Sequence, residues 1–276
     1  MIEPSISEVS PESGAQLTPE QAIANLQSSD LSLRYYAAWW LGKFRINRPE
    51  AVEALIEALT DEADRTELGG YPLRRNAARS LGKLGSSQAI EGLISSLNCE
   101  DFYVREAAAE SLAMLNAKTA VPELIKMLGG GLAQAVQVPG RPHLVQPYEA
   151  VLEALGSLGA TESIGLVKPF LEHSVPRVKC AAARAMYQLT QDSQYGEYLV
   201  EMLRSSDLKL QRVILGDLGA IGYMGSAEAI FQAKAENSFK LMALKGLLEH
   251  HLHLEDVSQG ISESAILVMN LMDSLL

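Results

Sequence analysis

The chain has 276 residues, of which 47% are hydrophobic, and a formal net charge of -11 at pH 7. This length and hydrophobic fraction allow a buried core, whereas the acidic balance argues against a nucleic-acid-binding protein, which would carry a basic excess. Two cysteines exclude a disulfide-stapled scaffold and suit a reducing, cytoplasmic location. The N-terminus lacks the pattern of a signal peptide, and no apolar run is long enough to predict a membrane span.

The chain begins with a polar stretch and then becomes helical. Residues 1–17 are rich in Ser, Glu and Pro, which predicts a flexible lead. Helical patterning starts at Thr18, an N-cap residue placed before Pro19 at the first helical position. No convincing strand pattern follows, so the predicted fold class is all-α. Residues 261–276 predict a further amphipathic helix that caps the C-terminal end or contacts a partner.

One helical pattern recurs along residues 18–255. Segments that begin at residues 34, 74 and 105 align without gaps as RYYAAWWLGKF, RRNAARSLGKL and REAAAESLAML. Each starts with a cation, has a small pair three and four residues later, and a Leu seven residues later. The same frame recurs from residues 148, 179, 211 and 240, with another amphipathic helix before most segments. Such pairs predict a HEAT-like α-solenoid, a right-handed superhelix of about seven helical hairpins.

Two insertions lengthen the turns within the pairs. Residues 61–71 extend the second pair, and residues 129–147, rich in Gly and Pro, extend the fourth. Long loops of this kind are either functional or mobile, and the sequence favours neither outcome. Gly85, Gly159 and Gly222 fall where inner helices are expected to end.

The segment at residue 34 carries four large aromatic residues. At 100° per residue, Ala37, Ala38 and Leu41 share a packing face, whereas the aromatic residues and Lys43 fall on the opposite arc, toward the expected concave groove. An aromatic wall beside guanidinium groups suits a flat, conjugated ligand with carboxylates, because rings stack on it and Arg binds carboxylates in bidentate fashion. The candidate ligand-binding residues are Tyr35, Tyr36, Trp39, Trp40, Lys43, Tyr71, Arg75, Arg79, Tyr103, Glu106 and Glu110.

The aromatic residues also have a purely structural interpretation. No pair precedes the first one, so Tyr36 and Trp40 could pack beneath residues 1–17 as a cap. The recurring cations Arg34, Arg74 and Arg105 lie on the packing face and are predicted to form hydrogen bonds between repeats. Cys180, on the groove arc of the fifth inner helix, is either a transient thioether site or a small residue in place of Ala.

The segments RYYAAWWLGKFR, YPLRRNAARSLGKLG and FYVREAAAESLAML resemble the E subunit of the E/F-type phycobilin lyases of cyanobacteria, and the resemblance covers nearly the whole chain. It implies a heterodimer with a homologous F subunit that binds phycocyanobilin and attaches it through a thioether to a cysteine of the apo-phycocyanin α subunit. Chromophore removal and transfer, and phycoerythrocyanin as acceptor, also belong to the family. On this interpretation Arg75, Arg79 and Lys43 pair with propionates, while Glu106 or Glu110 accepts hydrogen bonds from pyrrole N–H groups or favours the protonated bilin.

Addition of a thiol to a conjugated ethylidene takes its nucleophile from the acceptor, so we expect this chain to position the bilin and to carry no catalytic triad. The catalytic residue stays unknown. His143 is a candidate proton donor, although an isolated loop histidine more often has no role, and His250 and His253 predict a solvated helix end. Neither a metal nor a nucleotide cofactor is expected. The alternatives are a non-catalytic HEAT-like scaffold, a bilin chaperone, or the homologous phycoerythrocyanin lyase subunit.

Overall fold

The computed structural model describes residues 17–205, 207–254 and 261–276. Within these residues the regular secondary structure is helical, apart from one isolated antiparallel bridge between Gln137 and Leu144. The predicted all-α class is therefore confirmed. The helices are α1 (Pro19–Asn25), α2 (Leu31–Lys43), α3 (Pro49–Ala58), α4 (Pro72–Leu84), α5 (Ile90–Ser96), α6 (Phe102–Met114), α7 (Val121–Met127), α8 (Gly131–Gln134), α9 (Tyr148–Ser157), α10 (Ile164–Val167), α11 (Pro176–Thr190), α12 (Ser193–Ser205), α13 (Leu208–Ile221), α14 (Ala227–Gln232), α15 (Asn237–Leu254) and α16 (Glu263–Asp273).

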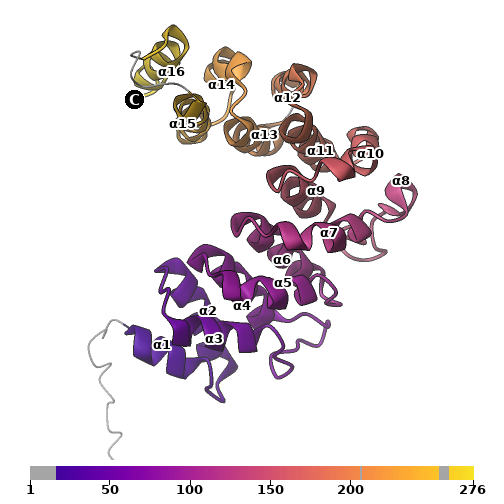
Figure 1. Cartoon of the computed structure of the whole chain (residues 1–276), viewed down its shortest axis with the longest axis vertical. Helices are drawn as coiled ribbons and strands as arrows, with labels where there is room; N and C mark the ends of the chain where they lie inside the picture. Colours follow the sequence, from indigo (N-terminus) through magenta and orange to yellow (C-terminus); the bar gives the residue numbers. More distant parts are fainter. Residues whose placement is uncertain (1–16, 206, 255–260) are drawn as a thin grey trace, which may run out of the picture.

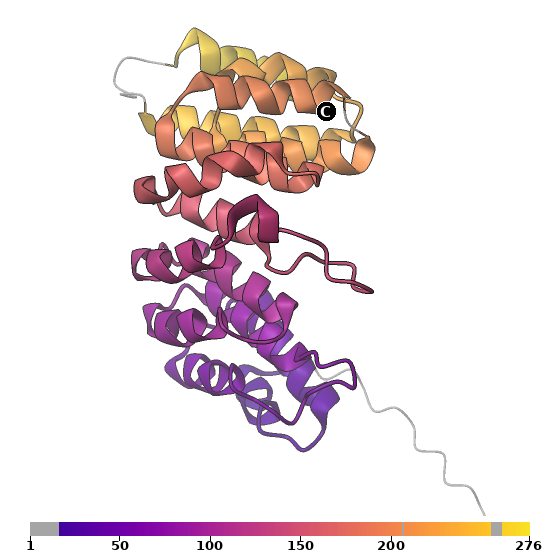
Figure 2. The ribbon, with the colours of Figure 1, turned by 90° about the vertical axis from the view of Figure 1, so that its right-hand side faces the viewer.

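The helices form two layers of a crescent (Figure 1). The inner layer consists of α2, α4, α6, α9, α11, α13 and α15, and each of these helices contacts the next one in the series. The outer layer consists of α1, α3, α5, α7, α10, α12 and α14. The pairs are stacked along the long axis of the molecule (Figure 2), and α16 packs on α14 and α15 at the end of the stack. This arrangement confirms the predicted HEAT-like solenoid of helical hairpins. Residues 1–16 of the predicted N-terminal lead lie outside the described residues.

Local signals in the sequence set the helix ends. Thr18 and Gln21 form a capping box at the start of α1, with each side chain bonded to the other residue's backbone N–H. The carboxylate of Asp30 accepts from backbone N–H groups at the start of α2. Gly85 and Gly222 end α4 and α13 in the left-handed conformation, with φ of 76° and 64°, as predicted.

Small residues allow the backbones of successive inner helices to pack closely against each other. A Cβ atom added to Gly42 of α2 would lie 2.3 Å from Ser80 Oγ of α4, and one added to Gly82 would lie 2.5 Å from Ser111 Oγ of α6. The Leu seven residues after each cation is buried beside these contacts, as Leu41 is on α2. The repeat frame therefore encodes the spacing of the inner layer as well as its hydrophobic core.

The recurring arginines join each pair to the next. Arg34 Nε donates to the carbonyl of Leu26 at 2.9 Å. This bond gives a hydrogen-bond partner to a backbone carbonyl in the turn before α2. Each of the three side chains then reaches the following pair: Arg34 contacts Asp61 at 2.5 Å, Arg74 contacts Cys99 Sγ at 3.9 Å, and Arg105 contacts Gln146 at 3.0 Å. The predicted hydrogen bonds between repeats are confirmed.

Candidate functional site

One strip of each inner helix faces the hollow of the crescent, because the outer helices cover the opposite side. This strip contains the residues one, five and nine positions after the first residue of each segment, and all of them from α2 to α9 are half-buried or exposed. We call it the inner groove. It consists of Tyr35, Trp39 and Lys43 on α2; Arg75, Arg79 and Lys83 on α4; Glu106, Glu110 and Met114 on α6; and Glu149, Glu153 and Ser157 on α9. The inner groove thus changes along its length from aromatic to basic to acidic.

The aromatic end of the inner groove is accessible. Tyr35 and Trp39 are exposed, and Trp39 retains 42% of its accessible surface. Tyr36 is 47% exposed, and its ring centroid lies 5.5 Å from that of Trp39. The equivalent of Tyr36 on α4 is Asn76, which is buried and donates to the carbonyl of Tyr35. Tyr36 is therefore at the N-terminal flank of the layer and borders the groove at that side.

Trp40 does not line the inner groove, so its predicted placement was wrong. It is only 7% exposed and packs against Phe44, with ring centroids 4.8 Å apart. Its equivalents on the next helices, Ser80 and Ser111, point at the preceding inner helix. Trp40 points in the same direction, along the axis of the solenoid, and fills space at the end of the inner layer, since no inner helix precedes α2 among the described residues. The alternative cap formed by residues 1–17 involves residues 1–16, which lie outside the described part of the chain.

The prediction for Tyr71 was also wrong. This side chain is 3% exposed and lies at the N-terminal end of α4. Its hydroxyl is within hydrogen-bond distance of Glu100 (2.8 Å) and Glu62 (3.1 Å), and the hydrogen bond to Glu100 is the main reason that its pKa is raised to about 12. The guanidinium carbon of Arg74 lies 3.9 Å from its ring centroid. Tyr71 fixes the 61–71 insertion onto α4 and has no surface left for a ligand.

Arg75 is the arginine of the inner groove that forms no ion pair in the described part of the chain, in contrast to Arg79. Its Nε atom is buried and lacks a hydrogen-bond partner there, and its guanidinium carbon lies 5.8 Å from the ring centroid of Tyr103. Arg79, one turn later, is 3.5 Å from Glu106 and 3.9 Å from Glu110. An unpaired guanidinium with a buried donor gains most from an incoming anion.

Burial raises the pKa values of Glu106, Glu110 and Glu149 in the acidic part of the groove. The guanidinium groups of Arg79 and Arg177 oppose this effect in part. Carboxylates in such surroundings gain from N–H donors that replace the lost water. Glu149 was not among the predicted residues, although it occupies the same repeat position as Arg75 and Glu106, which was the signal that could have identified it.

A buried ionic cluster lies beyond the acidic part of the groove. Arg184 Nη1 on α11 donates to Glu153 at 3.0 Å and to Asp217 at 3.2 Å, so it links α9, α11 and α13. Arg184 and Glu153 also line a cavity of about 410 Å³ together with Glu110 and Met114. Burial, with the charge of Glu153, raises the pKa of Asp217 to about 7. This cluster also escaped the sequence prediction.

Neither thiol is placed to act on a ligand in the groove. Cys180 is completely buried, and burial raises the pKa of its thiol to about 12, so the thioether alternative was wrong. Cys99 lies at the turn before α6 beside Arg74. The described residues contain no group of three or more His, Cys, Asp or Glu side chains that could hold a metal ion.

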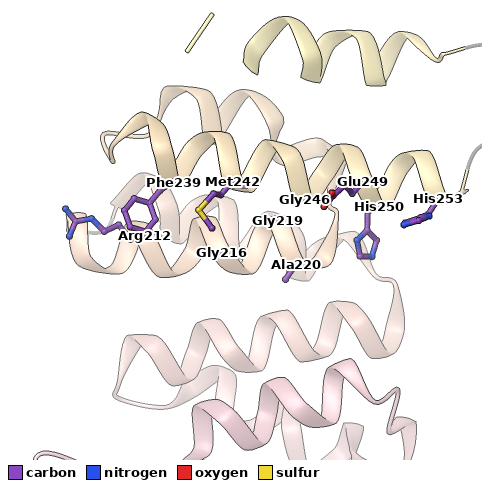
Figure 3. Close-up of a pocket in the computed structure, with 11 residues that line it drawn as sticks. Arg212, Gly216, Gly219, Ala220, Phe239, Met242, Gly246, Glu249, His250 and His253 are labelled. Carbon is purple, nitrogen blue, oxygen red and sulfur yellow. The ribbon is translucent and has the colours of Figure 1, made fainter. Parts of the chain in front are cut away.

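A second, larger hollow lies at the C-terminal end of the inner layer, between α13 and α15 (Figure 3). Its volume is about 710 Å³, and Gly216, Gly219 and Gly246 form much of its floor. His250 and His253 lie at one end and Arg212 with Phe239 at the other. It contains none of the predicted ligand-binding residues.

Comparisons with known proteins agree with this architecture. Residues 33–61 match the model of the PBS lyase HEAT-like repeat, and residues 70–137 match that of HEAT repeats. A phycocyanobilin lyase subunit alpha of Nostoc sp. strain PCC 7120 is 72% identical over 276 residues, which is the full length of both chains. The chain belongs to the phycocyanobilin lyase alpha-subunit family. A second member of the family, from Thermosynechococcus vestitus, is 60% identical over 86% of this chain and 88% of its own length.

Two further relatives are informative about the protein partner and about the protein that accepts the bilin. One chain in the structure of the complex of CpcE and CpcF of phycocyanin lyase from Nostoc sp. PCC7120 is 71% identical, with a TM-score of 0.89 over 99% of this chain and 100% of that chain. The bilin biosynthesis protein PecE of Nostoc sp. strain PCC 7120 is 43% identical over 94% of this chain and 96% of its own length. In the family member described here, none of the described helices is long and apolar enough to cross a membrane.

Proposed function

We propose that this chain is the alpha subunit of a heterodimeric lyase that attaches phycocyanobilin by a thioether bond to a cysteine of the phycocyanin α subunit. Relatives that are 72% and 60% identical bear the name phycocyanobilin lyase subunit alpha. A homologue that is 71% identical forms a complex with CpcF, which supports an F-type subunit as the partner. Identity to PecE is lower, at 43%, and this favours phycocyanin over phycoerythrocyanin as the acceptor.

The observation that carries the proposal is the position of Arg75 on α4, the inner helix that contacts α2 and its exposed rings. Tyr35 and Trp39 offer ring faces to a flat conjugated molecule, and the next helix supplies a guanidinium group with a buried, unpartnered Nε. A linear tetrapyrrole with two propionates matches both features, because its rings stack and a carboxylate pairs with Arg75. Lys43 and Lys83 are exposed residues of the inner groove on α2 and α4, and either can form an ion pair with the other propionate.

The reaction needs little chemistry from this chain. The acceptor's thiolate sulfur forms a bond to the ethylidene carbon, and a proton adds to the conjugated system, so that the sum is addition of S–H across the double bond. The residues of the inner groove hold the ethylidene in one orientation and exclude others, which converts an unselective addition into a directed one. Trp39 and Arg75 are binding residues in this mechanism.

Glu106 and Glu110 are suited to the pyrrole N–H groups. Both carboxyl groups are held beside Arg79, and burial raises their pKa values. In the ionised form they accept hydrogen bonds from N–H groups and favour the protonated bilin, and in the neutral form either can donate a proton. The weaker likeness to PecE supports a second candidate function, the same attachment to a phycoerythrocyanin subunit.

Reconstitution tests the proposal. The chain is mixed with phycocyanobilin, with and without the F-type partner, and the absorption spectrum is recorded. We expect a red-shifted, sharpened band from an extended, protonated bilin. Apo-phycocyanin α is then added, and after denaturation a zinc-fluorescent protein band reports the covalent adduct. A bound bilin without an adduct would identify a bilin chaperone, and an unchanged spectrum in both mixtures would identify a scaffold without bilin chemistry.

A further inference from the structure

The 129–147 insertion is fixed onto the solenoid at both ends. At its start, the buried His173 donates from Nε2 to the carbonyl of Ala135 at 2.8 Å, while its Nδ1 accepts from the backbone N–H of Val175. At its end, Arg105 donates to the carbonyl of Val145 at 2.9 Å and to the side chain of Gln146. The segment between these anchors is therefore held as a lid over the N-terminal ends of α6, α9 and α11.

A cavity of about 310 Å³ lies beneath this lid. It is lined by residues of three inner helices and by the lid itself, among them Tyr103, Glu106, His143, Tyr148, Glu149 and Arg177. Glu106 belongs to the inner groove, so the cavity is continuous with the groove at its acidic part. Its volume is at the lower end of the range for small-molecule sites, which suits one ring-sized end of a larger ligand.

The wall of the cavity is aromatic and has a fixed geometry. The rings of His143 and Phe102 are stacked, with centroids 4.3 Å apart and planes inclined by 15°. The ring of Tyr103 meets both edge-on, at centroid distances of 5.8 Å from His143 and 5.3 Å from Phe102. The guanidinium carbon of Arg75 lies over the ring of Tyr103, 5.8 Å from its centroid. The aromatic surface of the cavity therefore continues toward Arg75, the unpaired arginine of the groove.

The hydrogen bond of His143 determines which of its ring atoms can bind a ligand. Its Nδ1 lies 2.9 Å from the carbonyl oxygen of Leu144. A carbonyl only accepts, so Nδ1 must carry the proton, and in the neutral ring Nε2 then offers a lone pair. Nε2 of His143 has no partner in the described part of the chain. The polar side of the cavity is completed by Glu149, which pairs with Arg177 at 2.9 Å.

We propose that this cavity is an end compartment of the inner groove that receives one terminal ring of the bilin, with the lactam N–H of that ring bonded to Nε2 of His143. This inference rests on the proposed function. The terminal rings of a linear tetrapyrrole are lactams, so each presents one N–H donor and one planar face, which match the lone pair and the aromatic wall. The lid thus encloses one end of the chromophore and leaves the other end near α2.

The compartment also selects the shape of the ligand. Two interhelical steps, each of about 8–10 Å, separate Trp39 on α2 from Tyr103 on α6. A bilin that fills the compartment and also stacks on Trp39 must be extended, because a coiled conformer keeps its terminal rings close together. The extended conformer has a stronger long-wavelength absorption band relative to its near-ultraviolet band. The occupancy of the compartment is therefore visible in the spectrum of the bound bilin.

The test compares four variants of the full chain in complex with its partner, with phycocyanobilin as the probe. His143→Phe keeps the stack on Phe102 and removes the acceptor. Val175→Phe fills the cavity from the start of α11. Val136→Phe is the matched control, because Val136 is an exposed residue of the same insertion that does not line the cavity. Arg75→Ala tests binding in the inner groove outside this cavity. Circular dichroism and co-purification with the partner check folding.

We expect His143→Phe to weaken bilin binding about five- to tenfold, as the loss of one hydrogen bond predicts. Val175→Phe is expected to weaken it at least as much, and both variants lower the ratio of long-wavelength to near-ultraviolet absorbance. Val136→Phe binds like the unmodified chain. If Arg75→Ala weakens binding while His143→Phe and Val175→Phe retain affinity and spectrum, the end compartment is refuted and the proposed function stands. If all four variants bind alike, both ideas fail.

Discussion

Ser80 donates a hydrogen bond of 2.6 Å to the carbonyl of Ala38, across the contact between α4 and α2. The same bond recurs one repeat later, where Ser111 donates to Ala78 at 2.8 Å. These serines occupy the repeat position that faces the preceding inner helix, and on α2 that position holds Trp40. The large ring is thus tolerated on α2, because in the described part of the chain no inner helix has to approach it from that side.

Trp39 and Trp40 are adjacent in sequence and are expected to respond differently to truncation. Trp39→Ala removes an exposed groove ring, so it should abolish bilin binding and leave the free energy of unfolding nearly unchanged. Trp40→Ala removes a buried ring and should lower the free energy of unfolding by about 3–5 kcal/mol. Urea denaturation and absorbance titration measure the two effects. Equal destabilisation by both, with binding retained, would show that the rings of α2 serve only the fold.

The close contacts of the inner layer predict opposite effects of the same substitution at two glycines. Gly42→Ala places a Cβ 2.3 Å from Ser80 Oγ and 2.8 Å from its Cα, and should destabilise the fold by about 1–3 kcal/mol. Gly216→Ala on α13 meets no atom within 4 Å and should stabilise it by about 0.5–1 kcal/mol. Thermal unfolding of both variants checks this. A neutral Gly42→Ala would mean that α2 and α4 can separate at little cost.

Arg75 is expected to recognise a carboxylate of the ligand. Arg75→Ala should weaken binding of phycocyanobilin about tenfold to a hundredfold, as for a lost hydrogen bond to a charged group, and should leave the affinity for its dimethyl ester unchanged. Lys83→Ala, at an exposed position of the same helix, is a comparison with a smaller expected effect. Equal losses for the acid and the ester upon Arg75→Ala would contradict the assignment.

Asp217 should make stability depend on pH. Its pKa is raised from 3.8 to about 7 in the folded state, mainly by burial. Between these values the folded protein keeps a proton that the unfolded chain releases, so the contribution of this group to stability is lost as the pH rises from about 4 to about 7. The slope is at most about 1.4 kcal/mol per pH unit. Asp217→Asn should flatten the profile of unfolding free energy measured by urea denaturation at pH 5, 6, 7 and 8. Parallel profiles for the two proteins would contradict the raised pKa.

The repeat pattern in the sequence predicts the order and packing of the inner helices, and it predicts some of the residues that line the inner groove. A cation, a small pair and a Leu at fixed spacing identify the inner helices α2, α4 and α6, and looser versions of the same frame identify the later ones, because these positions meet the same neighbours in each repeat. The frame also places Tyr35, Trp39 and Arg79 in the groove. A helical wheel misplaces Trp40, since it divides a helix into one buried and one free face. An inner helix of a solenoid contacts its outer helix and two inner neighbours, so more than half of its surface is covered.

The contacts of the two insertions could not be predicted, because loops have no periodicity that reports what they touch. Tyr71 is buried by acidic residues of its own insertion and of the next turn. The 129–147 segment is rich in Gly and Pro, yet it is held by Arg105 and His173 from other elements. Such long-range polar contacts depend on the assembled solenoid and leave no mark in the local sequence.

The hydrogen bond of 3.3 Å from Arg141 to the carbonyl of Leu68 joins the insertion of the fourth pair to that of the second and bypasses the third pair. A solenoid bends through small rotations between successive helix pairs. This contact links the second and fourth pairs directly along one edge of the stack. Bending that opens that edge must break it. The contact thereby restrains the curvature of the crescent around α6. The width of the inner groove at α6 is therefore less affected by bending elsewhere in the solenoid.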